Sequence, residues 1–234
     1  MRDDVRGEGN AGRRNFLRTV FAGAVTAAAT GGVIGLVNPE LLNAQTNLSP
    51  DAAFEELMAG NQRFAANQMT SFEHDLTILK EHTAGKQEPF AGVLSCADSR
   101  VPVELVFDQT IGHLFVTRVA GNVSTSDMIA SLEYGVAVLG IKALLVLGHS
   151  NCGAVKAAMK AESVPGQIST LYPYLRQAVE QSGGNFDKAI EANAKIQADL
   201  LRTSSTVIKE AVQAGKLKVQ AGVYDLASGK VTLT

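Results

Sequence analysis

Cysteine is scarce in this sequence, because the 234-residue chain has only Cys96 and Cys152. Two cysteines in a chain of this length argue against a disulfide framework of the kind that stabilises small secreted domains. Net charge is also small: 21 basic and 23 acidic residues give a formal charge of −2, and no basic stripe is present. This balance argues against a nucleic-acid partner. The 46% of hydrophobic residues is enough for one domain with a sizeable core.

Each cysteine has a further candidate metal ligand close to it. Asp98 lies two residues after Cys96, and His149 lies three residues before Cys152. Zinc takes four ligands of these sulfur, nitrogen and oxygen types, so the two clusters together predict one zinc site. The simpler interpretation, two small buried apolar side chains, leaves this pairing unexplained. The fourth position falls either to Asp98, which would close the site, or to a water, which would make it catalytic.

Arg100 follows Asp98 by two residues. A guanidinium can hold a carboxylate by a bidentate ion pair. We therefore expect Arg100 to keep Asp98 away from the metal, so that the carboxylate accepts a hydrogen bond from the metal's water instead of displacing it. An ordinary salt bridge in a loop is the alternative interpretation of this pair.

Strand and helix patterns alternate along the chain after residue 45. A capping serine, a proline and an aspartate at residues 49–51 predict the start of a helix. A second helix is expected from about Ser126. The other predicted elements are strands at 90–94, 114–116 and 143–147, helices at 167–181 and 187–214, and a hairpin formed by 218–225 and 230–233. Such alternation predicts an α/β fold, with a mostly parallel β-sheet flanked by helices and an N-terminal helical arm, in one domain over residues 45–234.

The candidate ligands follow two of these predicted strands. Cys96 comes after the first apolar run and His149 after the run at 143–147, where open α/β sheets bind ligands. Cys152 would open a helix, whose N-terminus favours a thiolate. Gly148 and Gly153 flank the second cluster, which predicts that the glycines allow a tight backbone turn there.

Residues 1–44 differ from the rest in composition. Arg13 and Arg14 precede a stretch from 19 to 37 that has no charged residue and is rich in Ala, Gly and Val. This pattern resembles a twin-arginine export signal. A transmembrane anchor is the alternative, although the Ala, Gly and Thr content makes the stretch weakly hydrophobic.

The resemblance implies export of an already folded protein by the twin-arginine machinery. We therefore expect delivery to a periplasm or an equivalent extracytoplasmic lumen. Cleavage is expected after Ala44, and an uncleaved segment would leave the protein tethered to the membrane. Zinc loaded before export would protect the two thiolates from forming a disulfide.

Four stretches of the sequence together resemble a known family. They are Cys-Ala-Asp-Ser-Arg-Val-Pro at 96–102, Phe-Val-Thr-Arg-Val-Ala-Gly-Asn at 115–122, Ser-Leu-Glu-Tyr at 131–134 and Leu-Gly-His-Ser-Asn-Cys-Gly-Ala at 147–154. In this order, over about residues 50–226, they are similar to the β-class carbonic anhydrases. The resemblance implies reversible hydration of carbon dioxide to bicarbonate and a proton, with one Zn²⁺ per chain in a homodimer or higher homo-oligomer.

The resemblance also assigns roles to individual residues. Cys96, His149 and Cys152 would be zinc ligands, and Asp98 with Arg100 would form the catalytic dyad. Gln87 lies nine residues before Cys96, where the family has a glutamine that hydrogen-bonds the substrate.

The chain also departs from the family pattern. Val119 replaces a frequent asparagine, and His113 stands where an acidic residue is common. Arg118 matches an arginine of a non-catalytic bicarbonate site in some members, but the tryptophan that completes that site is absent, because the chain has none.

Three functions are compatible with the sequence. The first is carbon dioxide hydration. The second is hydrolysis of carbon disulfide or carbonyl sulfide on the same fold, and the third is a non-catalytic, zinc-stabilised binding protein. The Asp98–Arg100 pair and Gln87 argue against the third function, because a structural zinc site needs none of them.

Overall fold

The computed structural model describes residues 46–71, 80–81, 83–161 and 163–234. The export segment predicted for residues 1–44 lies outside this described part. None of the helices within the described ranges has the length and apolar character needed to cross a membrane.

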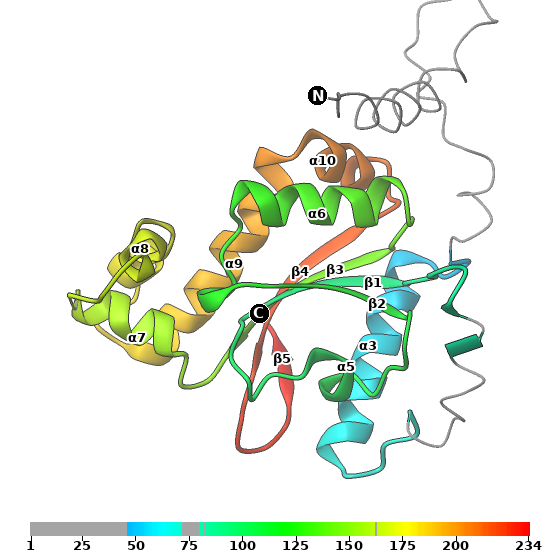
Figure 1. Ribbon diagram of the computed structural model, residues 1–234, viewed down its shortest axis with the longest axis horizontal. Coiled ribbons are helices and arrows are strands. Elements are labelled where there is room, and N and C mark those ends of the chain that lie inside the picture. Colours follow the sequence, from blue (N-terminus) through cyan, green and yellow to red (C-terminus); the bar gives the residue numbers. More distant parts are fainter. Residues whose placement is uncertain (1–45, 72–79, 82, 162) are drawn as a thin grey trace, which may run out of the picture. The chain divides into compact units, whose positions relative to one another are not determined.

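Five strands form one sheet in the order β2-β1-β3-β4-β5 (Figure 1). Their bounds are Ala91–Ser95 for β1, Leu114–Arg118 for β2, Ala143–His149 for β3, Lys218–Tyr224 for β4 and Val231–Leu233 for β5. The first four strands pair in parallel, and β5 pairs antiparallel with β4. The predicted mostly parallel sheet and its C-terminal hairpin are therefore confirmed.

Helices cover both faces of this sheet (Figure 1). One face carries α3 (Pro50–Ala65) and α5 (Val103–Val106), and the other carries α6 (Ser126–Ala137), α9 (Phe186–Ser204) and α10 (Thr206–Gln213). In β3, Leu145 and Leu147 pack on the first side, whereas Leu144 and Val146 pack on the second. Burial on both sides explains why this strand shows no hydrophobic alternation.

Four further helices of the described residues lie near the carboxyl ends of the strands. They are η1 (Ala120–Asn122), α7 (Gly153–Lys160), η2 (Ile168–Leu171) and α8 (Tyr172–Gln181). A third apolar cluster joins α7, α8 and α9, and it includes Cys96 and Cys152.

Helix α3 begins as the sequence predicts. The Ser49 hydroxyl oxygen accepts a hydrogen bond from the Ala52 amide at 3.1 Å, which satisfies one of the free amides of the first turn. Phe54 and Leu57 of this helix are buried in the core cluster that also contains Leu145. Helix α3, which the sequence predicted as an N-terminal arm, therefore packs on the β-sheet of the same chain.

The single helix predicted over 187–214 is wrong, because Ser205 divides it into α9 and α10. Ser205 has extended backbone angles, φ −106° and ψ 120°. Its hydroxyl oxygen accepts a hydrogen bond from the Ile208 amide at 3.0 Å and donates one to Glu133 at 2.6 Å. Serine competes with the helical backbone in this way and favours a cap over a helix interior. Both helices bury apolar side chains in one cluster, which explains why the helical pattern continues across the break.

A buried carboxylate fixes the segment that follows α5. Asp108 has a positive φ of 47° and a fully buried side chain. Its oxygens accept hydrogen bonds from Arg63 Nε at 2.5 Å, the Thr70 amide at 3.0 Å and the Ser71 amide at 2.9 Å. Burial would raise the pKa of Asp108, but these donors outweigh it and hold that pKa well below its usual range.

Candidate metal centre

The parallel pairing of β1 and β3 brings the two ligand clusters to one edge of the sheet. Ser95 pairs with Leu147, so Cys96 directly follows one strand while His149 ends its neighbour. Cys152 is the residue that precedes α7. The predicted location at the carboxyl ends of parallel strands is confirmed.

The side chains of Cys96, His149 and Cys152 converge there. Their sulfur and ring nitrogen atoms lie within 4.8 Å of one another, and all three residues are buried. His149 Nδ1 donates a hydrogen bond to the Ser150 carbonyl oxygen at 2.9 Å, which leaves Nε2 as an acceptor. Among the described residues that buried Nε2 has no hydrogen-bond partner, as expected of a ring nitrogen that binds a metal.

Without a metal these three groups compete for protons. The hydrogen bond from Cys152 lowers the pKa of Cys96 to about 4, and the same contact strongly raises the pKa of Cys152. Burial opposes protonation of His149, but the neighbouring Cys96 sulfur outweighs it and raises the His149 pKa. A divalent cation would replace the shared protons, and two thiolates with one imidazole are ligands that zinc prefers. The donor set therefore fits zinc.

Asp98 lies beside this group and is held by Arg100. Arg100 Nη2 donates to Asp98 Oδ2 at 2.7 Å, while its Nε and its backbone amide both donate to Oδ1 at 2.9 Å. This pairing holds the pKa of Asp98 well below its usual range. Asp98 Oδ2 is also 3.8 Å from His149 Nε2, so the carboxylate adjoins the ligand group. Whether Asp98 or a water takes the fourth zinc position stays a prediction.

Arg118 and Gly121 fix the backbone of Cys96 and Asp98 and the Cys96 sulfur, respectively, and the sequence did not predict either role. Arg118 donates through Nε to the Cys96 carbonyl oxygen at 3.0 Å and through Nη2 to the Asp98 carbonyl oxygen at 2.6 Å. The Gly121 amide donates to Cys96 Sγ at 3.3 Å. Both residues belong to the motif at 115–122, but a sequence motif does not show the direction in which a hydrogen-bond donor points.

The turn between β3 and α7 depends on a different residue from those predicted. Gly148 lies within β3 and Gly153 within α7, and neither has a positive φ. Asn151 has the left-handed φ of 56°, a conformation that asparagine tolerates better than most residues. The prediction that the two glycines allow the turn is therefore wrong. Arg100 also reaches this turn, because its Nη2 donates to the Asn151 carbonyl oxygen at 3.4 Å.

Gln87 lies in the exposed segment before β1. Within the described part of the chain, the hydrogen bonds of the Asp98 carboxylate come from Arg100. The structure therefore does not join Gln87 to the dyad by a hydrogen bond within one chain, and its role in substrate binding stays a prediction.

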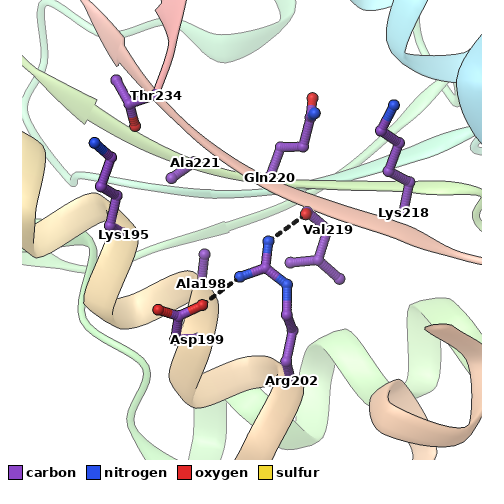
Figure 2. Close-up of a pocket in the computed structure, with 9 residues that line it drawn as sticks. All are labelled: Lys195, Ala198, Asp199, Arg202, Lys218, Val219, Gln220, Ala221 and Thr234. Carbon is purple, nitrogen blue, oxygen red and sulfur yellow. Dashed lines mark hydrogen bonds and ion pairs between the residues drawn. The ribbon is translucent and has the colours of Figure 1, made fainter. Parts of the chain in front are cut away.

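A separate pocket of about 320 Å³ lies between α9 and β4 (Figure 2). Its lining includes Lys195, Arg202 and Lys218, and each already forms an ion pair, with Glu191, Asp199 and Asp51 respectively. Lys218 pairs with Ala143 at the beginning of β3, whereas His149 ends that strand, so the pocket lies away from the ligand group. Its lining contains neither cysteine nor histidine.

Known proteins that resemble this chain are carbonic anhydrases. The family model described as carbonic anhydrase matches residues 91–231. Carbonic anhydrase 2 of Mycobacterium tuberculosis is 34% identical over 204 residues, which cover 80% of this chain and 94% of that protein. The carbonic anhydrase of Mycolicibacterium smegmatis is 33% identical over 195 residues, with the same two coverages.

Solved structures show the same fold. The β-carbonic anhydrase CafA of Aspergillus fumigatus has a TM-score of 0.63 at 30% identity, covering 77% of this chain and 90% of that one. A tetrameric β-carbonic anhydrase from Sordaria macrospora has the same TM-score at 22% identity, covering 78% and 96%. The chain belongs to the β-carbonic anhydrase family. Its cofactor is zinc, for which Cys96, His149 and Cys152 form a suitable group.

Proposed function

We propose that this protein catalyses the reversible hydration of carbon dioxide to bicarbonate and a proton. The observation that carries the proposal is a buried Cys96–His149–Cys152 group with an Arg100-bound carboxylate beside it, in a chain of the carbonic anhydrase family. Zinc, when bound, supplies a Lewis acid that makes water acidic enough to react near neutral pH.

Asp98 and Arg100 would supply the orienting part of the chemistry. The Asp98 carboxylate can accept a hydrogen bond from the reacting water, which directs the oxygen lone pair toward carbon dioxide. Arg100 holds both carboxylate oxygens, so Asp98 stays ionised and stays in place. The Arg100 side chain is 49% exposed and that of Asp98 is 18% exposed, so the dyad forms the solvent side of the centre, where a small substrate can enter.

The alternatives receive less support. The relatives reported above are named carbonic anhydrases, which does not favour carbon disulfide or carbonyl sulfide as the substrate. A structural zinc protein would need no arginine to hold a carboxylate at the edge of the centre.

Stopped-flow hydration of carbon dioxide by the zinc-loaded full chain tests the proposal, with carbon disulfide hydrolysis measured in parallel. We expect carbon dioxide hydration well above the buffer rate and little activity on carbon disulfide. A chain that holds one zinc and hydrates no carbon dioxide would refute the proposed function.

We also propose that the protein assembles as a homodimer or a higher homo-oligomer. Support comes from the tetrameric Sordaria macrospora enzymes, which share its fold. Light scattering coupled to size-exclusion chromatography should give a mass of at least twice 24.6 kDa for the full chain. A monomer at micromolar concentration would contradict this expectation.

We propose, finally, that residues 1–44 direct export through the twin-arginine pathway, on the basis of Arg13, Arg14 and the uncharged stretch that follows. The double variant Arg13→Lys, Arg14→Lys should accumulate in the cytoplasm, whereas the unaltered chain should fractionate outside it. Mass spectrometry of the exported form locates the cleavage, expected after Ala44. Unchanged fractionation of the double variant would indicate another route or an anchor.

A further inference from the structure

Helix α9 buries two amide side chains that the proposed chemistry does not use. Asn193 is 1% exposed and Gln197 is 0% exposed, and they lie one helical turn apart. Burial of an amide is unfavourable unless its polar atoms find hydrogen-bond partners. The partners of these two side chains therefore indicate what the pair holds in place.

Both amides bind residues near the carboxyl ends of the strands: Gly121 in η1, Tyr174 in α8 and Ser124 between η1 and α6. Gln197 Oε1 accepts from the Ser124 amide at 2.7 Å, and its Nε2 donates to Asn193 Oδ1 at 3.2 Å and to the Tyr174 carbonyl oxygen at 3.1 Å. Asn193 Nδ2 then donates to the Gly121 carbonyl oxygen at 2.8 Å. The chain of hydrogen bonds runs from α9 to Gly121.

Gly121 is the residue whose amide donates to Cys96 Sγ at 3.3 Å. Its φ is +76°, and a Cβ at this position would lie 3.3 Å from both Ala154 Cβ and a Leu175 methyl carbon. A side chain at this position would be strained and tightly packed, whereas glycine has the most backbone freedom. The direction of its N–H group therefore depends on what holds the neighbouring peptide, and Asn193 holds that carbonyl.

We propose that Asn193 is a positioning residue for the metal centre: by holding the Gly121 carbonyl group it limits rotation about the Gly121 backbone, so that the Gly121 N–H in the preceding peptide group stays directed at the Cys96 sulfur, and Gln197 orients Asn193. The proposal rests on the zinc centre described above. An N–H donor stabilises negative charge on a thiolate ligand and fixes its orientation. Outer hydrogen bonds of this kind typically change metal affinity about 10–100-fold.

A purely structural role makes a different prediction. If Asn193 only joins α9 to η1, its loss should lower the free energy of unfolding without a specific effect on the metal. Ser205 provides a matched control, because it is also buried, caps a helix and hydrogen-bonds Glu133. None of the hydrogen bonds of its side chain involves a metal ligand or Gly121.

The experiment compares Asn193→Ala with Ser205→Ala in the full chain. Zinc affinity is measured by competition with a chromophoric chelator, and the thiolate-to-metal charge-transfer bands are recorded after Co²⁺ substitution. We expect Asn193→Ala to lower zinc affinity up to about 10-fold, the lower end of the range for a direct outer hydrogen bond because Asn193 acts through Gly121, and to shift these bands. Ser205→Ala should change neither, although its melting temperature should also fall.

Wild-type affinity and an unchanged Co²⁺ spectrum in Asn193→Ala would overturn the proposal, as would an equal loss in Ser205→Ala. If Asn193→Ala does not fold, Gln197→Met decides in its place, because it removes the donor to Asn193 Oδ1 at similar side-chain volume. It should shift the bands in the same direction by a smaller amount, and an unchanged spectrum would be the contrary result. Both measurements are independent of turnover, so a failure of carbon dioxide hydration would leave them interpretable.

Discussion

Removing the Arg100 side chain should separate zinc binding from catalysis. In Arg100→Ala the Asp98 carboxylate loses two of its three hydrogen bonds with Arg100, but the backbone amide of residue 100 still binds Oδ1. The atom set free is Oδ2, which lies 3.8 Å from His149 Nε2. We therefore expect Oδ2 to turn toward the Cys96–His149–Cys152 group and close the fourth position.

The expected loss of hydration rate is about a hundredfold or more, the range typical of a lost positioning or acid–base group. Zinc should stay at one equivalent per chain, because its three strongest ligands are unchanged. Arg100→Lys is the matched comparison: it keeps the charge but lacks the planar fork, so it should lie between the wild type and Arg100→Ala.

The assay is zinc content against stopped-flow hydration rate, together with the Co²⁺ spectrum of each variant. The spectrum of Arg100→Ala should change, whereas that of the double variant Asp98→Ala, Arg100→Ala should not show the same change. A fully active, zinc-loaded Arg100→Ala would refute the reasoning and reduce the dyad to an ordinary loop salt bridge.

Three other changes have clear expected outcomes. Cys152→Ala should lose most of its zinc by metal analysis, since one of two thiolates is removed, and full retention would contradict the ligand assignment. Asp98→Ala should retain zinc but lose much of the hydration rate, and an unchanged rate would exclude a catalytic role. Asp108→Asn should lower the free energy of unfolding at pH 7 by about 1.5–3 kcal/mol, because it weakens the charge-assisted hydrogen bond between the buried Asp108 carboxylate and the half-buried Arg63. Because the pKa of Asp108 is depressed, this stabilisation is complete above the unfolded pKa of about 3.9 and declines as pH falls below it. The difference in melting temperature between the unaltered protein and Asp108→Asn should therefore become smaller as the pH is lowered from 7 to 3. A difference that does not change with pH would contradict the role assigned to Asp108.

Much of the fold could be predicted from local patterns. The Ser49 cap, the unalternating strand at 143–147 and the C-terminal hairpin depend on neighbours in sequence, and each agrees with the structure. The break at Ser205 could not be predicted in this way. Its reason is tertiary, since Glu133 on another helix accepts the hydrogen bond from the Ser205 hydroxyl group.

The residues of the metal centre also differ in whether local sequence patterns could predict them. Cys96, His149 and Cys152 could be brought together from the sequence because parallel strands end at a common edge. The roles of Arg118 and Asn193 could not, because they depend on side-chain directions and on partners that are distant in sequence. The positive φ of Asn151 could not be predicted, because glycine is the usual residue in that conformation and two glycines lie close by in the sequence.

Because the chain is synthesised from its N-terminus, the position of each residue in the sequence affects when the metal centre can form. All of its candidate ligands have been synthesised by residue 152, yet β3 gains its second neighbour only with β4, at residues 218–224. The side-chain amides that hydrogen-bond Gly121 and Ser124 belong to Asn193 and Gln197. A nascent chain therefore carries the complete ligand set for a long stretch of synthesis before the framework around it exists. The finished geometry of the metal centre therefore requires nearly the whole chain.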